Sequence, residues 1–125
     1  MIRATTPKHI FAFDMDPSLF SKMLITYEQD GCIVLEKTED DMTFDTVTDS
    51  QTGDVIEYVA WVRLTQEETA RFKPERAAPS RCGGKHSKVY VQVRVLTSTG
   101  EAMASDPYQV DVFDVFNDEV LENEG

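Results

Sequence analysis

Apolar and polar residues alternate most regularly over residues 88–96, which read Lys-Val-Tyr-Val-Gln-Val-Arg-Val-Leu. Side chains along a strand point alternately to opposite faces, so the four valines share one face of an extended strand. Valine is β-branched, which favours a strand over a helix. The pattern predicts the central strand of an antiparallel sheet. Its valines face a core, and Tyr90, Gln92 and Arg94 face water or a partner.

Shorter alternating segments predict the remaining strands, at residues 9–13, 22–29, 32–37, 42–47, 55–64 and 101–113, the last kinked at 105–107. Apolar residues occur on both faces of the strand at 55–64, which indicates that it is covered on both sides, at least at its end. Residues 1–7 read as a loose arm that leads into the first strand.

Asp30-Gly31 predicts a hairpin, because this dipeptide tolerates the positive φ angles of a tight turn. In the return strand, period-two alternation places Ile33 and Leu35 on one face. Thr65 and Glu68 fit a capping box at the start of a helix, so we expect a short helical turn over residues 66–72.

About seven short strands, one capped turn and a long penultimate strand predict an all-β fold. We expect an immunoglobulin-like antiparallel β-sandwich over residues 1–113, followed by an acidic tail at 114–125. The 125 residues suit one domain, and a chain of this size can form a core without disulfides or metal.

A net charge of −11 argues against affinity for nucleic acid or for an anionic membrane, since both are polyanions. No secretory leader is recognisable at the start of the sequence, and no apolar run approaches the roughly 18 residues that span a bilayer. We therefore expect the chain to fold in a bacterial cytoplasm and to pass from there into a virion if it is assembled into one. Two cysteines suit buried or free thiols in that compartment.

A loop at residues 73–87 contains two prolines and paired glycines, and basic residues concentrate in and beside it. Long loops without regular structure are often functional, and opposite charges on two proteins guide their association. We predict an interaction surface from this loop, the outer face of the valine strand and the apolar residues of the tail. The predicted contact residues are Arg71, Lys73, Arg76, Arg81, Lys85, Lys88, Tyr90, Arg94, Phe116 and Leu121.

No arrangement of residues in the sequence indicates catalysis. Cys82 and His86 could supply two zinc ligands, but a tetrahedral site needs two more, and only Cys32 and His9 remain. A cysteine nucleophile would need a histidine held in a fixed geometry, which a glycine-rich loop does not provide. The acidic clusters are typical of solvated turns. We expect no catalytic residue, no metal and no cofactor.

Several segments together resemble small uncharacterised proteins encoded in phage and prophage regions of Gram-positive, often gut, bacteria. These segments read TPKHIF at residue 6, ITYEQDG at 25, VRLTQEET at 62, VQVRVLT at 91, ASD at 104 and NDEVL at 117. The order of strands and turns is also loosely similar to the N-terminal β-sandwich of phage baseplate upper proteins. The resemblance implies a virion or tail-assembly context and an immunoglobulin-like fold, and it carries no catalytic residue. Residues 48–54 and 73–87 depart from the pattern as insertions.

We therefore expect a non-catalytic structural or assembly module of a phage or prophage particle. Its partners would be proteins, either phage structural subunits or further copies of the chain. The alternative is a β-sandwich module that binds carbohydrate or a cell surface. Such a module would present exposed aromatic rings, and the candidates Trp61 and Tyr58 read as buried.

Overall fold

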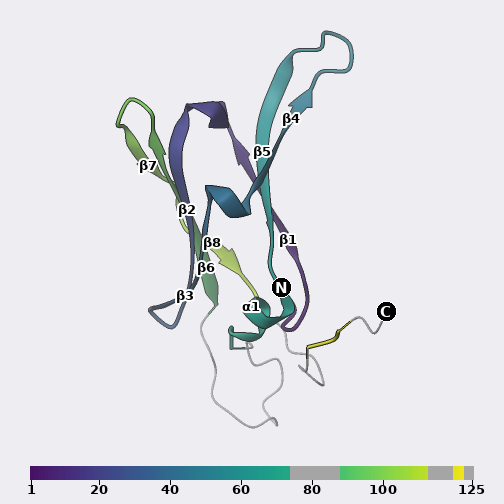
Figure 1. Cartoon of the computed structure of the whole chain (residues 1–125), viewed down its shortest axis with the longest axis vertical. Coiled ribbons are helices and arrows are strands. Elements are labelled where there is room, and N and C mark those ends of the chain that lie inside the picture. The colour runs from purple at the N-terminus through teal and green to yellow at the C-terminus, as the bar shows by residue number, and fades with distance from the viewer. Residues whose placement is uncertain (74–87, 113–119, 123–125) are drawn as a thin grey trace.

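Two antiparallel sheets form the body of the molecule, as the computed structural model shows for residues 1–73, 88–112 and 120–122 (Figure 1). The strands are β1 (Lys8–Phe13), β2 (Phe20–Gln29), β3 (Cys32–Thr38), β4 (Thr43–Thr48), β5 (Val55–Arg63), β6 (Val89–Thr97), β7 (Ala102–Ala104) and β8 (Tyr108–Val110). Two short 3-10 helices, η1 (Pro17–Leu19) and η2 (Glu39–Asp41), and one α-helix, α1 (Gln66–Ala70), lie between strands. The all-β prediction is confirmed for the described residues.

Strand β6 lies in the middle of the larger sheet, as its valine pattern predicts. That sheet has the order β3-β2-β6-β7, and β8 also pairs with β6. Val89, Val91 and Val93 are buried, whereas Tyr90 and Arg94 on the opposite face are exposed. The smaller sheet has the order β1-β5-β4.

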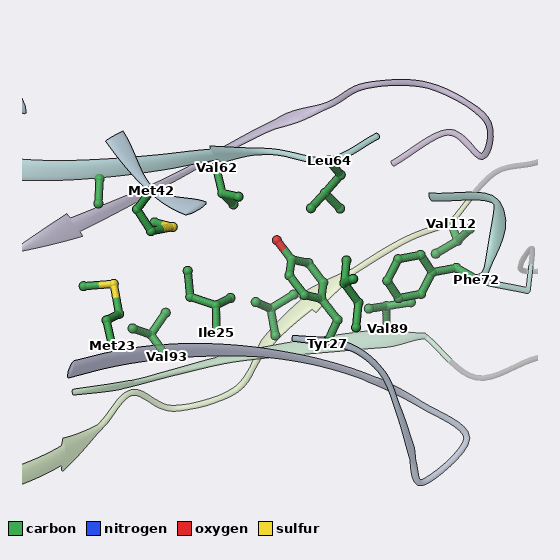
Figure 2. Packing of buried hydrophobic residues seen from close by; sticks show 13 residues of the cluster. Met23, Ile25, Tyr27, Met42, Val62, Leu64, Phe72, Val89, Val93 and Val112 are labelled. Atoms are coloured by element: carbon green, nitrogen blue, oxygen red, sulfur yellow. The ribbon is translucent and has the colours of Figure 1, made fainter. Parts of the chain in front are cut away.

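The core lies between the two sheets. Met23, Ile25 and Tyr27 on β2 point toward Val62 on β5 and Leu64 just after it (Figure 2). Full burial of such side chains stabilises a fold by about 1.5–3 kcal/mol each, so this layer supplies most of the driving force for folding.

The hairpin between β2 and β3 turns at Asp30 and Gly31, whose φ angles are 57° and 78°. The predicted turn is therefore confirmed. A bulge changes the register between Tyr27 and Glu28, so that Tyr27 pairs with Leu35 and Glu28 pairs with Ile33. Leu35 is consequently buried while Ile33 is exposed, and the prediction that the two share a face is wrong.

Helix α1 connects the two sheets and begins with the predicted capping box. The Thr65 hydroxyl accepts from the Glu68 amide at 3.1 Å, and the Glu68 carboxylate accepts from the Thr65 amide at 2.9 Å. The helix ends at Ala70, before the predicted end. Phe72 then enters the core, with its ring centroid 5.9 Å from that of Tyr27.

The last predicted strand is two strands, β7 and β8, so the described residues form eight strands. Ser105 lies between them and bonds to β6 twice, because its amide donates to the Val93 carbonyl and its hydroxyl accepts from the Val93 amide. These bonds replace the regular ladder at the kink. The predicted boundary between the domain and the tail at residue 113 lies outside the described residues.

The N-terminal residues are bonded to the body, so their prediction as a loose arm is wrong. The Arg3 guanidinium donates to the carbonyls of Phe72 and Ala70 at the end of α1. The amide of Thr5 donates to the Thr69 hydroxyl, which donates in turn to the Thr5 carbonyl. Arginine at a helix C-terminus satisfies carbonyls that lack a partner within the helix.

Candidate interaction surfaces

Tyr90 and Arg94 lie on the outer face of the larger sheet, on either side of Gln92. On the neighbouring strand β2, Glu28 pairs with Tyr90 and Leu24 pairs with Arg94. The structure therefore brings these two predicted residues onto one mixed, largely polar face. Exposed Tyr and Arg are enriched in protein interfaces.

Arg71 and Lys73 are exposed at the end of the molecule that carries α1. The backbone there is fixed by Gln29, whose side-chain amide donates to the Lys73 carbonyl and accepts from the Lys73 amide, both at 2.7 Å. Sequence analysis does not reveal this structural role of Gln29, because its partner lies 44 positions away along the chain.

Lys88 forms an ion pair with Asp111, with 2.6 Å between Nζ and Oδ1. The structure thus shows this predicted contact residue engaged within the chain. Arg76, Arg81, Lys85 and Phe116 lie outside the described residues, as do Cys82 and His86.

Leu121 is the most exposed large apolar residue in the described part of the chain, at 79%. Its backbone is bound by Gln66, which donates to the Leu121 carbonyl at 2.9 Å and accepts from the Leu121 amide at 2.8 Å. The start of α1 and this part of the tail therefore lie together.

His9 and Tyr27 form a polar contact between the two sheets, with 2.7 Å between Nδ1 and the phenol oxygen. Burial lowers the pKa of His9, with a smaller contribution from the positive amino terminus. Burial also raises the pKa of Tyr27, and the Glu68 carboxylate raises it further. Both groups are therefore neutral at pH 7, which suits a structural hydrogen bond inside a core.

Lys37 and Glu68 form an ion pair at 2.5 Å between β3 and α1. Burial alone would raise the pKa of Glu68, but hydrogen bonds from Lys37 and Thr65 outweigh it and lower that pKa overall. The pair fixes α1 to the larger sheet. Among the described residues, no group of three or more His, Cys, Asp or Glu is placed to hold a metal ion.

A hairpin made of β4 and the first part of β5 projects beyond the rest of the molecule (Figure 1). We call residues 43–58 the β4–β5 arm. All of β4 is exposed, and so are the first three residues of β5. Coverage of strand 55–64 on both sides is expected at least at its end, and its first three residues are exposed because the larger sheet does not extend that far (Figure 1).

Exposed apolar side chains concentrate on the arm. Phe44 pairs with Ala60 and so lies on the inner face, while Val47 pairs with Glu57 on the outer face. A register shift between Val47 and Thr48 brings Thr48 opposite Val55. The next residue, Ile56, is 66% exposed. Beside the arm, a hollow of about 370 Å³ is lined by η1 residues, Phe44 and Tyr58.

A second hollow, of about 510 Å³, lies at the end of the larger sheet beside η2, between Lys22, Arg94 and Met103. Glu39 in its wall accepts from the Met23 amide at 2.9 Å. This hydrogen bond lowers the pKa of Glu39 and links η2 to β2. The carboxylate thus has a structural role.

Trp61 is half-buried, because it lies on the outer face of the smaller sheet and pairs with Ile10. Lys8 Nζ lies 4.1 Å from the centroid of a Trp61 ring, in a cation–π contact. One face of this indole is thus already occupied.

The chain matches no protein-family model, and no curated protein or solved structure is significantly similar to it. In the part of the chain that the structure describes, no helix is both long and apolar enough to traverse a membrane.

Proposed function

We propose that this chain is a non-catalytic structural or assembly module of a phage or prophage particle, built on an immunoglobulin-like sandwich. The observation that carries the proposal is the β4–β5 arm, which holds apolar side chains in water on both faces. Apolar side chains exposed close together on a protein surface mark contact sites. An arm of this kind suits a protein that is completed by its neighbours.

Three hydrogen-bonded ionisable groups among the described residues support the same function. His9 bonds to Tyr27, Glu68 pairs with Lys37, and Glu39 binds the backbone of β2. Each of these groups holds two elements of the fold together, so its polar atoms serve packing and not a reacting ligand.

Glycan binding is the weaker alternative. Among the described residues, the exposed aromatic side chains are Phe44, Tyr90 and Tyr108, and they lie on three different strands. Carbohydrate modules present their rings as a platform, and Lys8 covers one face of Trp61.

The test of the assembly function is the composition of the particles themselves. The prophage of the source strain would be induced, its particles purified on a density gradient, and their proteins identified by mass spectrometry. We expect this chain at a fixed ratio to the structural subunits. Particles that lack the chain, while the free protein is abundant in the lysate, would show that it is not a particle component.

A further inference from the structure

The outer face of the smaller sheet is apolar at its centre. Residues directly opposite each other on antiparallel strands share a face, and β1 pairs with β5 so that Ile10 lies opposite Trp61 and Ala12 lies opposite Val59. Because Val62 on β5 faces the core, these four side chains lie on the other, outward face. Ile10 is 63% exposed, and none of the four is fully buried.

A sheet face that stays in water is normally polar, and the outer face of the larger sheet follows this rule. There Thr26 pairs with Gln92 and Glu28 pairs with Tyr90. The smaller sheet instead presents an apolar block across two strands, with Trp61, the single tryptophan of the chain, at its centre. An exposed apolar block with polar residues around it marks a contact site.

The two ends of this face carry charges of opposite sign. At one end Lys8 and Arg63 lie directly opposite each other on β1 and β5. At the other end Asp45 on β4 and Glu57 on β5 share the same face. All four residues are exposed. The face therefore has a basic end and an acidic end, and the apolar block separates them.

The charged groups that flank the face preserve this difference. Beyond the basic end, Glu67 lines a hollow with Arg63, and Glu122 follows the tail residue that is bound to α1. Beyond the acidic end, Asp14 follows β1 directly and Asp54 precedes β5 directly. These acids reduce the charge of the basic end and add to that of the acidic end, so the two ends still differ in charge.

Two of the charged groups on the face also bind the backbone of their own chain. One N–H of Arg63 donates to the Thr6 carbonyl at 3.3 Å, and the Asp45 carboxylate accepts from the Thr46 amide at 2.8 Å. A guanidinium has five N–H donors, so the bond to Thr6 leaves Arg63 able to bind a carboxylate of a partner.

The pattern along β5 is complementary to itself when the strand direction is reversed. Reversal about a point between Val59 and Trp61 brings Arg63 opposite Glu57 and Trp61 opposite Val59. The same orientation brings Arg63 opposite Glu57 a second time, because the two copies exchange roles. Two copies in the unreversed orientation would instead place like charges together, which is unfavourable.

We propose that two copies of the chain pack through the outer faces of their smaller sheets, about a two-fold axis that crosses the strands. The inference rests on the proposed function and names the partner and the face. Packed sheets keep their strand directions within about 30° of each other, which suits this arrangement. The contact is isologous and closes on itself, so the larger sheet of each copy remains available to other subunits.

Reversal of charge tests the pair that the symmetry brings together. Arg63→Glu and Glu57→Arg each place like charges face to face, and the double variant that carries both restores opposite charges. Arg94→Glu, on the outer face of the larger sheet, is the control for the arginine. The apolar block is tested by Ile10→Thr with Ile33→Thr as its control, because Ile33 on β3 is 60% exposed. Thermal melting first establishes that each variant is folded.

Sedimentation velocity over a concentration series, at about 0.15 M salt, measures the dissociation constant. We expect the wild type and the two controls to dimerise, and each single reversal and Ile10→Thr to raise the dissociation constant at least about tenfold. The double reversal should return it to within about threefold of wild type. Arg63→Glu makes the chain more acidic and Glu57→Arg makes it less so. A loss in both therefore distinguishes this contact from general repulsion between two chains of net charge −11.

Trp61 provides a second measurement, because no other tryptophan contributes to the emission. Dimerisation removes its ring from water. Its emission should therefore move to shorter wavelength, and quenching by acrylamide should weaken, as the protein concentration passes the dissociation constant. In Arg63→Glu both changes should occur at concentrations at least about tenfold higher.

Each other outcome overturns the contact. A dimer that Glu57→Arg strengthens is governed by overall repulsion and not by this pair. A double reversal that is as weak as the single reversals means that the two faces do not meet in the reversed orientation. Loss of the dimer in Arg94→Glu alone places the contact on the larger sheet. A wild type that is monomeric at every concentration excludes the dimer, and mass spectrometry of purified particles then decides the assembly function separately.

Discussion

The contact between His9 and Tyr27 shows how one buried polar pair can fit a hydrophobic layer. Each side chain lies on the inner face of a different sheet, and each supplies the other's hydrogen bond at 2.7 Å. A buried polar group without a partner costs about 1–3 kcal/mol, so the pair also selects the register in which the two sheets pack. Period-two alternation places His9 on the same face as Phe11 and Phe13, but it does not identify Tyr27 as the partner, which is 18 residues away and on another sheet.

The lowered pKa of His9 predicts a pH-dependent contribution to stability. Between the folded pKa and the unfolded value of 6.5, the unfolded chain binds more protons, so the stability due to His9 is complete above 6.5 and is lost as the pH falls. We expect wild type to lose more stability than His9→Gln between about pH 7 and pH 5, by up to about 1.4 kcal/mol per pH unit. Chemical denaturation of both proteins across this range measures the difference, in which shared carboxylate effects cancel. Parallel stability curves would contradict the prediction.

Replacement by alanine should destabilise the protein by very different amounts at two phenylalanines. Phe72 is fully buried against Tyr27, so Phe72→Ala should destabilise the fold by about 3–5 kcal/mol. Phe44 is 41% exposed on the arm, so Phe44→Ala should cost less than about 1 kcal/mol. Urea denaturation gives both values. Equal losses in the two variants would mean that the arm is part of the core in solution.

At the scale of elements, helix α1 depends on local bonds because it spans only five residues. Helices this short are unstable alone, so capping, the Lys37–Glu68 pair and the Arg3 contacts together hold it in place. Its capping box is readable in the sequence, since Thr65 and Glu68 lie at the required spacing. The residues that fix its other end are not readable, because Arg3 is distant in the sequence.

Removal of the α1 cap should have a measurable but limited effect. Thr65→Ala loses the hydroxyl that accepts from the Glu68 amide and should cost about 1 kcal/mol. Thr65→Ser retains the oxygen and should remain within about 0.5 kcal/mol of wild type. Guanidinium unfolding of the three proteins gives the comparison. If serine and alanine destabilise equally, the methyl group of Thr65 and not its hydroxyl is what matters.

Strands were easier to predict than their interruptions. Alternation over residues 88–96 and the Asp30-Gly31 turn are local signals, and both elements are found. The bulge that separates Ile33 from Leu35 and the break at Ser105 depend on bonds to a neighbouring strand. Period-two reasoning carries the same face through such positions, so it places Ile33 and Leu35 on one face, whereas the bulge puts them on opposite faces.

At the scale of the whole molecule, sequence analysis correctly indicated two apolar faces on the strand at 55–64 but not their environment. The sequence pattern of a strand is the same whether its apolar side chains are buried in the core of the same molecule or by a second molecule. The structure separates the cases: Ala60, Val62 and Leu64 are buried by the larger sheet, and Val55 and Ile56 remain in water. The predicted contact residues lie in the basic segment, on the outer face of β6 and in the tail. The β4–β5 arm is recognisable only when the lengths of the strands in the two sheets are compared.

This difference predicts that the arm can be shortened without loss of the fold. Replacement of residues 47–57 by Asn-Gly removes side chains that are exposed, apart from the partly buried Asp49. Little buried area is therefore lost, and a shorter connection costs less closure entropy. We expect a melting temperature, measured by circular dichroism, that is close to that of wild type. Val62→Ala is the matched control on the same strand, because Val62 is 1% exposed and its truncation should cost about 1–3 kcal/mol. If shortening the arm lowered stability more than Val62→Ala does, the arm would belong to the folding core and its apolar residues would need no partner to explain them.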